Sequence, residues 1–285
     1  RLGLSPHATT TVARKLYLDA VALARTGDVG GVGGDRSMCT HLAETPEERE
    51  FIAAGTGPHR ELLERLGVWE PSIIEDLGRG LHPVAHLADI LRSRPMTVAH
   101  VNDAPDEAIA ILAATGTSVV YCPHASAYFG AERHFGPHRY RDMLAAGINV
   151  AIGTDSIVNL PPAAAGMPSA TTPIDDASGI SIWQELRFLY ARDGTAPTTL
   201  LRMATVNGAH ALQFDSAPFA FTRGAPLAGL LAVKVNETSP LDLPGRALAA
   251  ALTSPHAPEL LFTDNHSGLT GILAETARPS PTVTA

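Results

Sequence analysis

The stretch Ser37-Met38-Cys39-Thr40-His41-Leu42-Ala43-Glu44 decides how this chain folds, because a short apolar run in it leads to a histidine and a glutamate. The pattern recurs at Met96 to His100 and at Val150 to Asp155, where an apolar run again ends on a polar residue. Short apolar runs that alternate with helical patterns are typical of a parallel sheet covered on both faces. We therefore expect an α/β fold in which these runs are strands of one sheet.

About five such strands can be recognised, and helical patterns separate them. The strands are expected at residues 2–5, 37–40, 96–99, 118–121 and 149–153. Helices are expected from Thr45-Pro46 onward and at residues 12–24, 61–66, 84–91, 105–114, 138–145, 182–190, 198–205 and 208–212. Such a set suits either an open doubly wound sheet or part of an eight-stranded barrel.

The chain changes character after about Gly224. Residues 1–223 carry the strand and helix units, residues 224–275 form a short extension with strands and one helix, and residues 276–285 have the composition of a disordered tail. The Gly-rich stretch 27–34 follows a helix and precedes a strand, the reverse of a dinucleotide-binding loop, so we interpret it as a flexible turn. The Pro-rich loop 160–178 is a candidate lid or interface.

Composition excludes several classes of protein. The net charge is −8 and no basic run is present, which argues against nucleic acid as a partner. No apolar run approaches the roughly 20 residues that span a bilayer, so no membrane partner is expected. Cys39 and Cys122 are too few for a disulfide framework, and a reducing, cytoplasmic setting fits them.

Polar residues follow the apolar runs at the ends of the expected strands. His41, His100 and Asp155 each come directly after a run, and His7 follows the first one. The carboxyl ends of parallel strands meet at one edge of the sheet, where α/β enzymes carry their sites. Imidazole and carboxylate groups are ligands that suit Zn²⁺ or Fe²⁺. The pattern therefore indicates a metal site at this edge.

Four further polar residues each have a functional and a structural interpretation, namely Glu44, His82, His86 and His124. Glu44 lies three residues beyond His41, so it can curl back over the site and move protons, or it can be a solvated acid at a helix start. His124 follows the strand at 118–121 and is a candidate substrate contact. His82 and His86 are spaced for one helix face, but Pro83 indicates that His82 precedes the helix.

An ordered set of motifs resembles a known family. The motifs are Ser5-Pro6-His7-Ala8, Thr40-His41-Leu42-Ala43-Glu44, Ala99-His100, Cys122-Pro123, Gly153-Thr154-Asp155-Ser156 and Ala204-Thr205-Val206-Asn207-Gly208-Ala209. Together they resemble the deaminase and chlorohydrolase branch of the amidohydrolase superfamily. Guanine deaminase, adenosylhomocysteine/methylthioadenosine deaminase and triazine hydrolases belong to that branch. The resemblance covers about residues 1–215.

The resemblance implies a fold and a set of roles. The fold would be a partial (β/α)8 TIM-like barrel of the metal-dependent hydrolase type, with a short C-terminal extension. It would hold one divalent ion, Zn²⁺ or alternatively Fe²⁺, on His41 and Asp155, with His100 beside the ion. Glu44, His100 and Asp155 would be catalytic. His7 matches a histidine of the family's substrate pocket. We also expect His124, from its position after a strand, and Ser156, next to Asp155, to contact the substrate.

The implied activity is removal of an amino group from an aminated N-heterocycle such as a purine, pterin or nucleoside. Alternatives are an amide or halide hydrolase at the same site, or a non-catalytic binding homologue. The family's first metal motif, a His-x-His pair, does not occur in this sequence, and we interpret the chain as lacking the N-terminal part. A small-molecule substrate and a possible homodimer are the expected partners.

Overall fold

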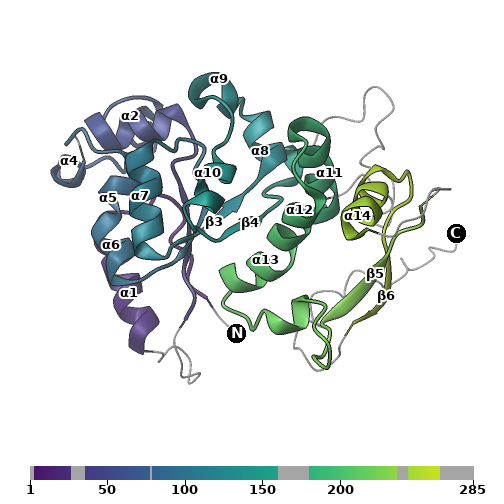
Figure 1. The fold of residues 1–285 in the computed structure, drawn as a ribbon. Coiled ribbons are helices and arrows are strands. Elements are labelled where there is room, and N and C mark those ends of the chain that lie inside the picture. The colour runs from purple at the N-terminus through teal and green to yellow at the C-terminus, as the bar shows by residue number, and fades with distance from the viewer. Residues whose placement is uncertain (1–2, 27–35, 78, 160–179, 236–242, 264–285) are drawn as a thin grey trace, which may run out of the picture. The chain divides into compact units, whose positions relative to one another are not determined.

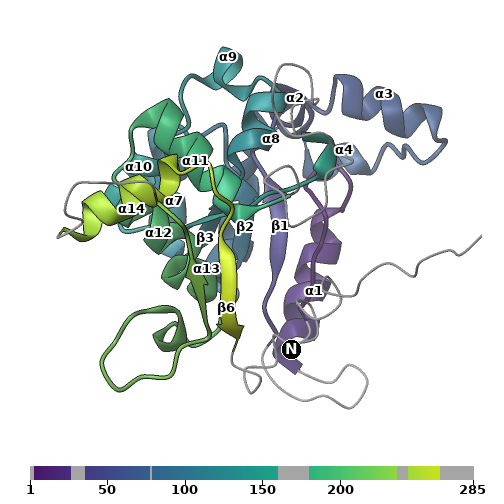
Figure 2. The same ribbon diagram turned by 90° about the vertical axis from the view of Figure 1, so that its right-hand side faces the viewer.

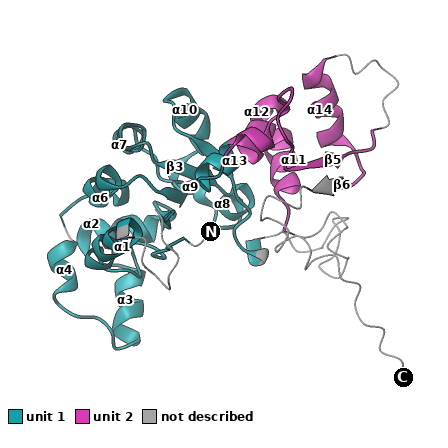
Figure 3. Cartoon of the chain, turned by 90° about the horizontal axis from the view of Figure 1, so that it is seen from below, with its two compact units in different colours: residues 1–160, 207–214 teal, residues 161–206, 215–285 magenta. Residues whose placement is uncertain are grey.

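The computed structural model describes residues 3–26, 36–77, 79–159, 180–235 and 243–263. The Gly-rich turn at 27–34, the Pro-rich loop at 160–178 and the tail at 276–285 therefore lie outside the described residues. The chain divides into two compact units, residues 1–160 with 207–214, and residues 161–206 with 215–285 (Figure 3).

Four parallel strands form the sheet of the first unit. They are β1 (Cys39–Leu42), β2 (Thr97–His100), β3 (Ser118–Tyr121) and β4 (Val150–Ile152), and they pair in chain order (Figure 1). Each pair is parallel, so after each strand the chain must return to the end of the sheet at which the strands begin. Helices make these crossovers. The predicted α/β class with a parallel sheet is confirmed.

The first paired strand ends two residues later than the sequence pattern indicates. Leu42 pairs with His100, so β1 covers 39–42 instead of 37–40, and both histidines lie within their strands rather than after them. The expected strand at 2–5 is reduced in the described residues to an isolated bridge between Leu4 and Met38. A second bridge joins Ala8 to His41, which brings the His7 segment alongside β1.

Helices connect the strands of the first unit. They are α1 (Arg14–Thr26), α2 (Pro46–Ala54), α3 (Pro58–Arg65), α4 (Ile73–Asp76), α5 (Pro83–His86), α6 (Ala88–Ser93), α7 (Asp106–Thr115), α8 (Pro123–Tyr128), α9 (Ala131–Phe135), α10 (Tyr140–Ala145) and α13 (Val206–Ala211), with a 3₁₀ turn η1 (Ile157–Asn159). Helices α1, α5, α6 and α7 lie side by side in Figure 1. Figure 2 shows α1 beside β1, where the Tyr17 hydroxyl hydrogen-bonds Thr40.

A row of side chains across the sheet forms the centre of the core. Val98, Val119 and Val150 are in register on neighbouring strands, and all three are fully buried. Burying one such side chain contributes about 1.5–3 kcal/mol. A smaller cluster of Phe51, Ile52 and Leu77 packs under α2 and α4. The core therefore fixes the strands on which the polar residues of the sheet edge stand.

The second unit is mainly helical. It contains α11 (Ile182–Asp193), α12 (Pro197–Ala204) and α14 (Pro244–Thr253), which contact one another, a 3₁₀ turn η2 (Ala217–Phe219), and an antiparallel pair of β5 (Gly229–Ala232) with β6 (Glu259–Thr263). Within the described ranges, none of the helices combines the length and the apolar composition that spanning a bilayer would require.

Candidate metal centre

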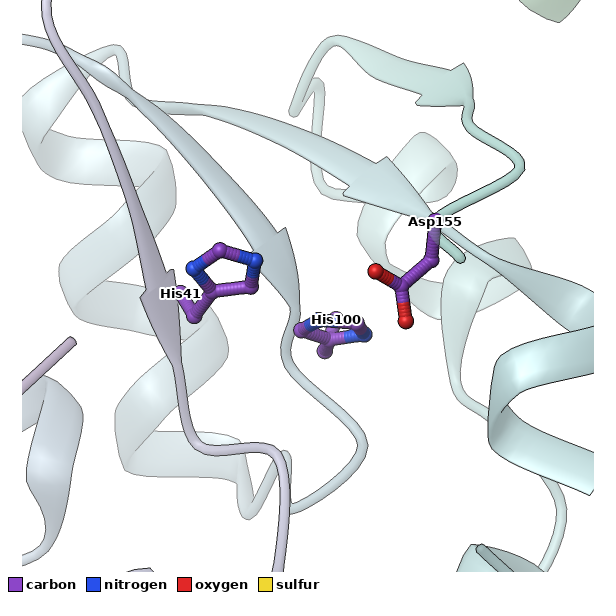
Figure 4. A group of neighbouring side chains, drawn as sticks. All are labelled: His41, His100 and Asp155. Carbon is purple, nitrogen blue, oxygen red and sulfur yellow. The ribbon is translucent and has the colours of Figure 1, made fainter. Parts of the chain in front are cut away.

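Three predicted residues come together at the carboxyl-terminal edge of the sheet. His41 stands on β1, His100 ends β2, and Asp155 lies in the turn after β4 (Figure 4). Each of them offers one ligand atom, and these atoms all lie within 4.8 Å of one another. Figure 4 shows His100 between the other two side chains. The arrangement joins two imidazoles and one carboxylate at a single point.

The ring of His41 is held in one tautomer. Its Nδ1 lies 2.8 Å from the backbone oxygen of His7, and because a carbonyl can only accept, Nδ1 must carry the proton. The lone pair is therefore on Nε2. The hydroxyl of Thr40 donates to the same carbonyl at 3.2 Å, and the buried Tyr17 hydroxyl hydrogen-bonds Thr40 at 2.7 Å. The His7 segment thus orients a candidate metal ligand through its backbone.

His100 reaches the site because its backbone leaves the strand conformation. His41 pairs with Ala99, so regular alternation along β2 would turn the His100 side chain to the opposite face. Its φ of 72° breaks that alternation, and the two rings stack with centroids 5.2 Å apart. Burial, together with the nearby His41, lowers the pKa of His100 to about 4 and keeps the ring neutral, which is the form that binds metal.

His138, which the sequence pattern did not single out, hydrogen-bonds the backbone of His100. His138 is buried, and its Nε2 donates to the His100 carbonyl oxygen at 2.9 Å. The backbone N–H of Tyr140 donates to His138 Nδ1 at 3.1 Å, which fixes the proton on Nε2. The His138 ring also stacks on Tyr121, with centroids 3.7 Å apart. No pattern in the sequence marks His138, because its partners are backbone groups of other segments.

Asp155 is held by a side chain that the sequence also did not single out. Asn159 is buried, and its Nδ2 donates to Asp155 Oδ2 at 2.7 Å. This bond fixes the carboxylate while leaving Oδ1 available. Asp155 itself has a φ of 56°. The spacing of four residues between Asp155 and Asn159 is the only signal that could have linked them in advance.

Glu44 faces the group from the turn after β1. Its Oε1 lies 3.6 Å from His100 Nε2, too far for a hydrogen bond. Burial raises the pKa of Glu44 to about 7; the charge of His41 opposes this, and the charges of Asp155 and Glu48 add to it. The carboxyl group is therefore poised between its two protonation states near neutral pH.

Backbone strain gathers at this edge of the sheet. The non-glycine residues with positive φ in the described chain are Ala43, His100, Val101, Asp155 and Gln213. His100 ends β2, and Ala43, Val101 and Asp155 lie in the turns that follow β1, β2 and β4. Such conformations cost about 1–3 kcal/mol each and persist where the surrounding structure enforces them. Val101 is β-branched, for which a φ of 51° is especially unfavourable. At His100 and Asp155, the strained backbone directs the side chains toward the group of three possible metal ligands.

The predicted substrate residues lie at the same edge but outside the group of three. The His7 ring is 4.9 Å from that of His41, and its Nδ1 is 2.8 Å from the Thr11 hydroxyl. Ser156 directly follows Asp155, and His124 lies in the first turn of α8, after β3. His82 is the residue before α5, as predicted, and its Nδ1 accepts from Val84 N–H at 3.1 Å.

Comparison with known proteins shows the family of this chain. The model of the Amidohydrolase family matches residues 2–217. An aminodeoxyfutalosine deaminase of Deinococcus radiodurans is 34% identical over 166 residues, which are 56% of this chain and 36% of that protein. The predicted resemblance to deaminases of this superfamily is confirmed by these matches.

Two solved structures share the fold. Helicobacter pylori aminofutalosine deaminase in complex with methylthio-coformycin has a TM-score of 0.65 at 18% identity, over 91% of this chain and 55% of that one. An adenosine deaminase of Xanthomonas campestris with bound zinc has a TM-score of 0.55 at 23% identity, over 87% of this chain and 47% of that one. The chain thus spans about half of each of these two proteins, and 36% of the Deinococcus radiodurans relative.

Proposed function

The chain belongs to the amidohydrolase family, and on that premise we propose that His41, His100 and Asp155 form the metal centre of an aminohydrolase. The observation that carries the proposal is the convergence of their three ligand atoms within 4.8 Å. The four-stranded parallel sheet would then be part of a (β/α)8 barrel, which the family and the fold of its relatives support.

The donor set fits a divalent ion. Two ligands that each lie about 2.1 Å from one ion are at most about 4.2 Å apart, so a pair as wide as 4.8 Å has to close by at least about 0.6 Å, and by more in a tetrahedral site. His100 Nε2 is buried and has no hydrogen-bond partner among the described residues, a cost that a metal ion would remove. His41 Nε2 is left with its lone pair by the bond from Nδ1 to His7.

Zinc is the ion we propose, with Fe²⁺ as the alternative. Three protein ligands of the His and carboxylate type are the usual number at a catalytic zinc site. The zinc-bound Xanthomonas campestris structure of the same fold supports this choice. A bound ion would supply Lewis acidity, which lowers the pKa of water and generates a nucleophile at neutral pH.

The protein's own groups would handle the protons and the geometry. Glu44 faces His100 from 3.6 Å away, so its carboxyl can accept a proton and deliver it to a ring nitrogen of the substrate. Asn159 and the His7 carbonyl keep Asp155 and His41 oriented. His7, His124 and Ser156 lie where a heterocycle at the edge of the sheet would meet them. An aminated purine nucleoside is the substrate class we propose, supported by relatives that are named as deaminases of methylthioadenosine and of adenosine.

Ammonia release from the intact protein tests the proposal. The panel is adenosine, methylthioadenosine, guanine and an aminopterin, each with Zn²⁺ and then after chelation. We expect release from at least one purine substrate only in the presence of metal. Release of halide or alkoxide from a substituted triazine without any ammonia would instead favour the alternative hypothesis, a hydrolase that removes another leaving group at the same site. No turnover of any compound by the metal-loaded protein would contradict both.

Two substitutions separate metal binding from proton transfer. Asp155→Ala removes a ligand, so we expect loss of bound metal and of turnover together. Glu44→Gln removes a proton carrier that is not among the three ligands, so metal content should stay while turnover falls about 10²- to 10⁴-fold. Metal content by mass spectrometry and ammonia release measure the two effects. Full metal occupancy in Asp155→Ala would remove Asp155 from the site.

A further inference from the structure

We propose that Glu48 is a positioning residue that holds the Glu44 turn in its working geometry. The inference rests on the proposed function, since it assigns Glu48 a part in the reaction that Glu44 would serve. In the sequence, Glu48 stands out only as an acid in the first turn of the helix expected from Thr45-Pro46 onward. The structure gives its carboxylate a different set of partners.

Glu48 is a buried carboxylate with three hydrogen bonds to the site segments. Only 4% of the residue is exposed. Its Oε1 accepts from the Ala43 N–H at 3.0 Å and from the Thr9 hydroxyl at 2.6 Å, and its Oε2 accepts from the Glu44 N–H at 2.7 Å. A buried ionised group is costly unless such partners satisfy it. The carboxylate therefore joins the turn after β1 to the His7 segment.

These bonds differ from those of an ordinary helix cap. In a capping box the acid at the third helical position bonds the N–H of the cap residue, here Thr45. Thr45 does cap the helix, because its side chain accepts from the Glu48 N–H at 3.2 Å. The Glu48 carboxylate passes over Thr45 and bonds the two preceding amides instead. It thus supports the residue that carries the proposed chemistry rather than the helix.

The same turn is held from its other side. The Glu44 carbonyl accepts from Asn102 Nδ2 at 3.0 Å, and the Ala43 carbonyl accepts from the Asp103 N–H at 3.0 Å. Ala43 has a φ of 54°, a conformation that its side chain disfavours. Without the two bonds from Glu48, the turn can relax toward an ordinary conformation. The Glu44 carboxyl would then lose its place opposite His100.

Glu48→Gln tests the role because it keeps the size of the side chain. The amide has one accepting oxygen, so it cannot accept from the Ala43 and Glu44 amides through separate oxygens. We expect kcat to fall about ten- to a hundredfold through misplacement of Glu44, with KM changed by less than about twofold. Bound metal should stay at the wild-type level. Glu47→Gln is the matched control, an exposed acid in the same helical turn, and should behave as wild type.

Hydrogen exchange at the Ala43 and Glu44 amides gives a readout that needs no substrate. Exchange should be faster at these amides in Glu48→Gln than in Glu47→Gln. Thr9→Val, which removes one hydroxyl from the carboxylate, should shift kcat and exchange in the same direction by less, and it serves if Glu48→Gln does not fold. Unchanged exchange, or an unchanged kcat, overturns the positioning role. Absence of ammonia release by the wild type overturns the proposed function alone, since exchange still reports on the turn.

Discussion

At the scale of single residues, the site depends on positive φ values at His100 and Asp155, which the regular alternation of side chains along a strand does not predict. His41 and Asp155 could be predicted, because each follows a short apolar run and the ends of parallel strands share an edge. His100 was predicted at this edge on the same ground, but the φ of 72° that turns its ring toward His41 could not be predicted. His138 and Glu48 were missed because they bond backbone groups that only the fold brings to them, and Asn159 was missed because its spacing of four residues from Asp155 is a weak signal.

Asn159 offers a prediction at this scale. Its amide fixes Asp155 Oδ2, and groups that orient metal ligands typically contribute ten- to a hundredfold to metal affinity. Asn159→Ala should therefore weaken Zn²⁺ binding by about that factor, as measured by calorimetric titration against a competing chelator. Val158→Ala, at a neighbouring side chain that is 61% exposed, should bind as wild type does. Equal affinities in the two variants would contradict the role of Asn159.

At the scale of elements, the sequence predicted the type of most strands and helices better than their ends. Strand 118–121 was predicted with its observed bounds, whereas β1 was placed two residues early, because apolar runs do not reveal where pairing stops. Helix α7 was found from Pro105 and the acids after it. Helices α8 and α9, of six and five residues, were not predicted.

Asp103 ties three elements together and makes stability depend on pH. Its carboxylate, in the turn after β2, lies 3.0 Å from Arg49 Nη1 on α2 and 3.3 Å from His82 Nε2 before α5. Burial alone would raise the pKa of Asp103, but the hydrogen bond and charge of His82, with those of Arg49, lower it below the usual value. The stabilisation is then complete above the unfolded pKa of about 3.9 and is lost as pH falls through the lower folded value.

Asp103→Asn should therefore cost about 1–3 kcal/mol of unfolding free energy at pH 7, and less as the pH drops below about 4. Urea denaturation of wild type and variant at both pH values measures the difference. Asp19→Asn, which removes an exposed carboxylate paired with Lys15, should cost about 0.5 kcal/mol or less. A cost for Asp103→Asn that did not shrink in acid would argue against an ionised carboxylate.

At the scale of the whole molecule, composition and the alternation of strands with helices predicted a parallel α/β sheet, and that prediction is confirmed. Whether the strands close into a barrel stays a prediction, because four strands are compatible with an open sheet or a barrel segment. The division between residues 160 and 161, with a return at 207–214, was not foreseen. Asn207 joins the returning segment to the sheet, because its side chain donates to the Val150 carbonyl and its backbone carbonyl accepts from the Asn149 side chain.

Metal binding should be visible in the stability of the molecule. A ligand that binds the folded state alone stabilises it by about 2.7 kcal/mol at a hundredfold excess over Kd. Thermal unfolding with Zn²⁺, and again after chelation, should therefore differ by several degrees. The Asp155→Ala variant should lose most of that difference. The same shift in this variant would point to metal bound elsewhere on the chain.

The bond from His41 to a carbonyl has an evolutionary consequence. The group that selects the His41 tautomer is the backbone of His7, which every amino acid at that position supplies. The side chain at position 7, 4.9 Å from the His41 ring, is therefore free to diversify. Descendants of this sequence can exchange it to accept new compounds while inheriting an unaltered ion-binding imidazole. The side chain of residue 7 can thus change substrate recognition while its backbone keeps His41 in place. Position 7 is therefore a natural starting point for directed changes of specificity.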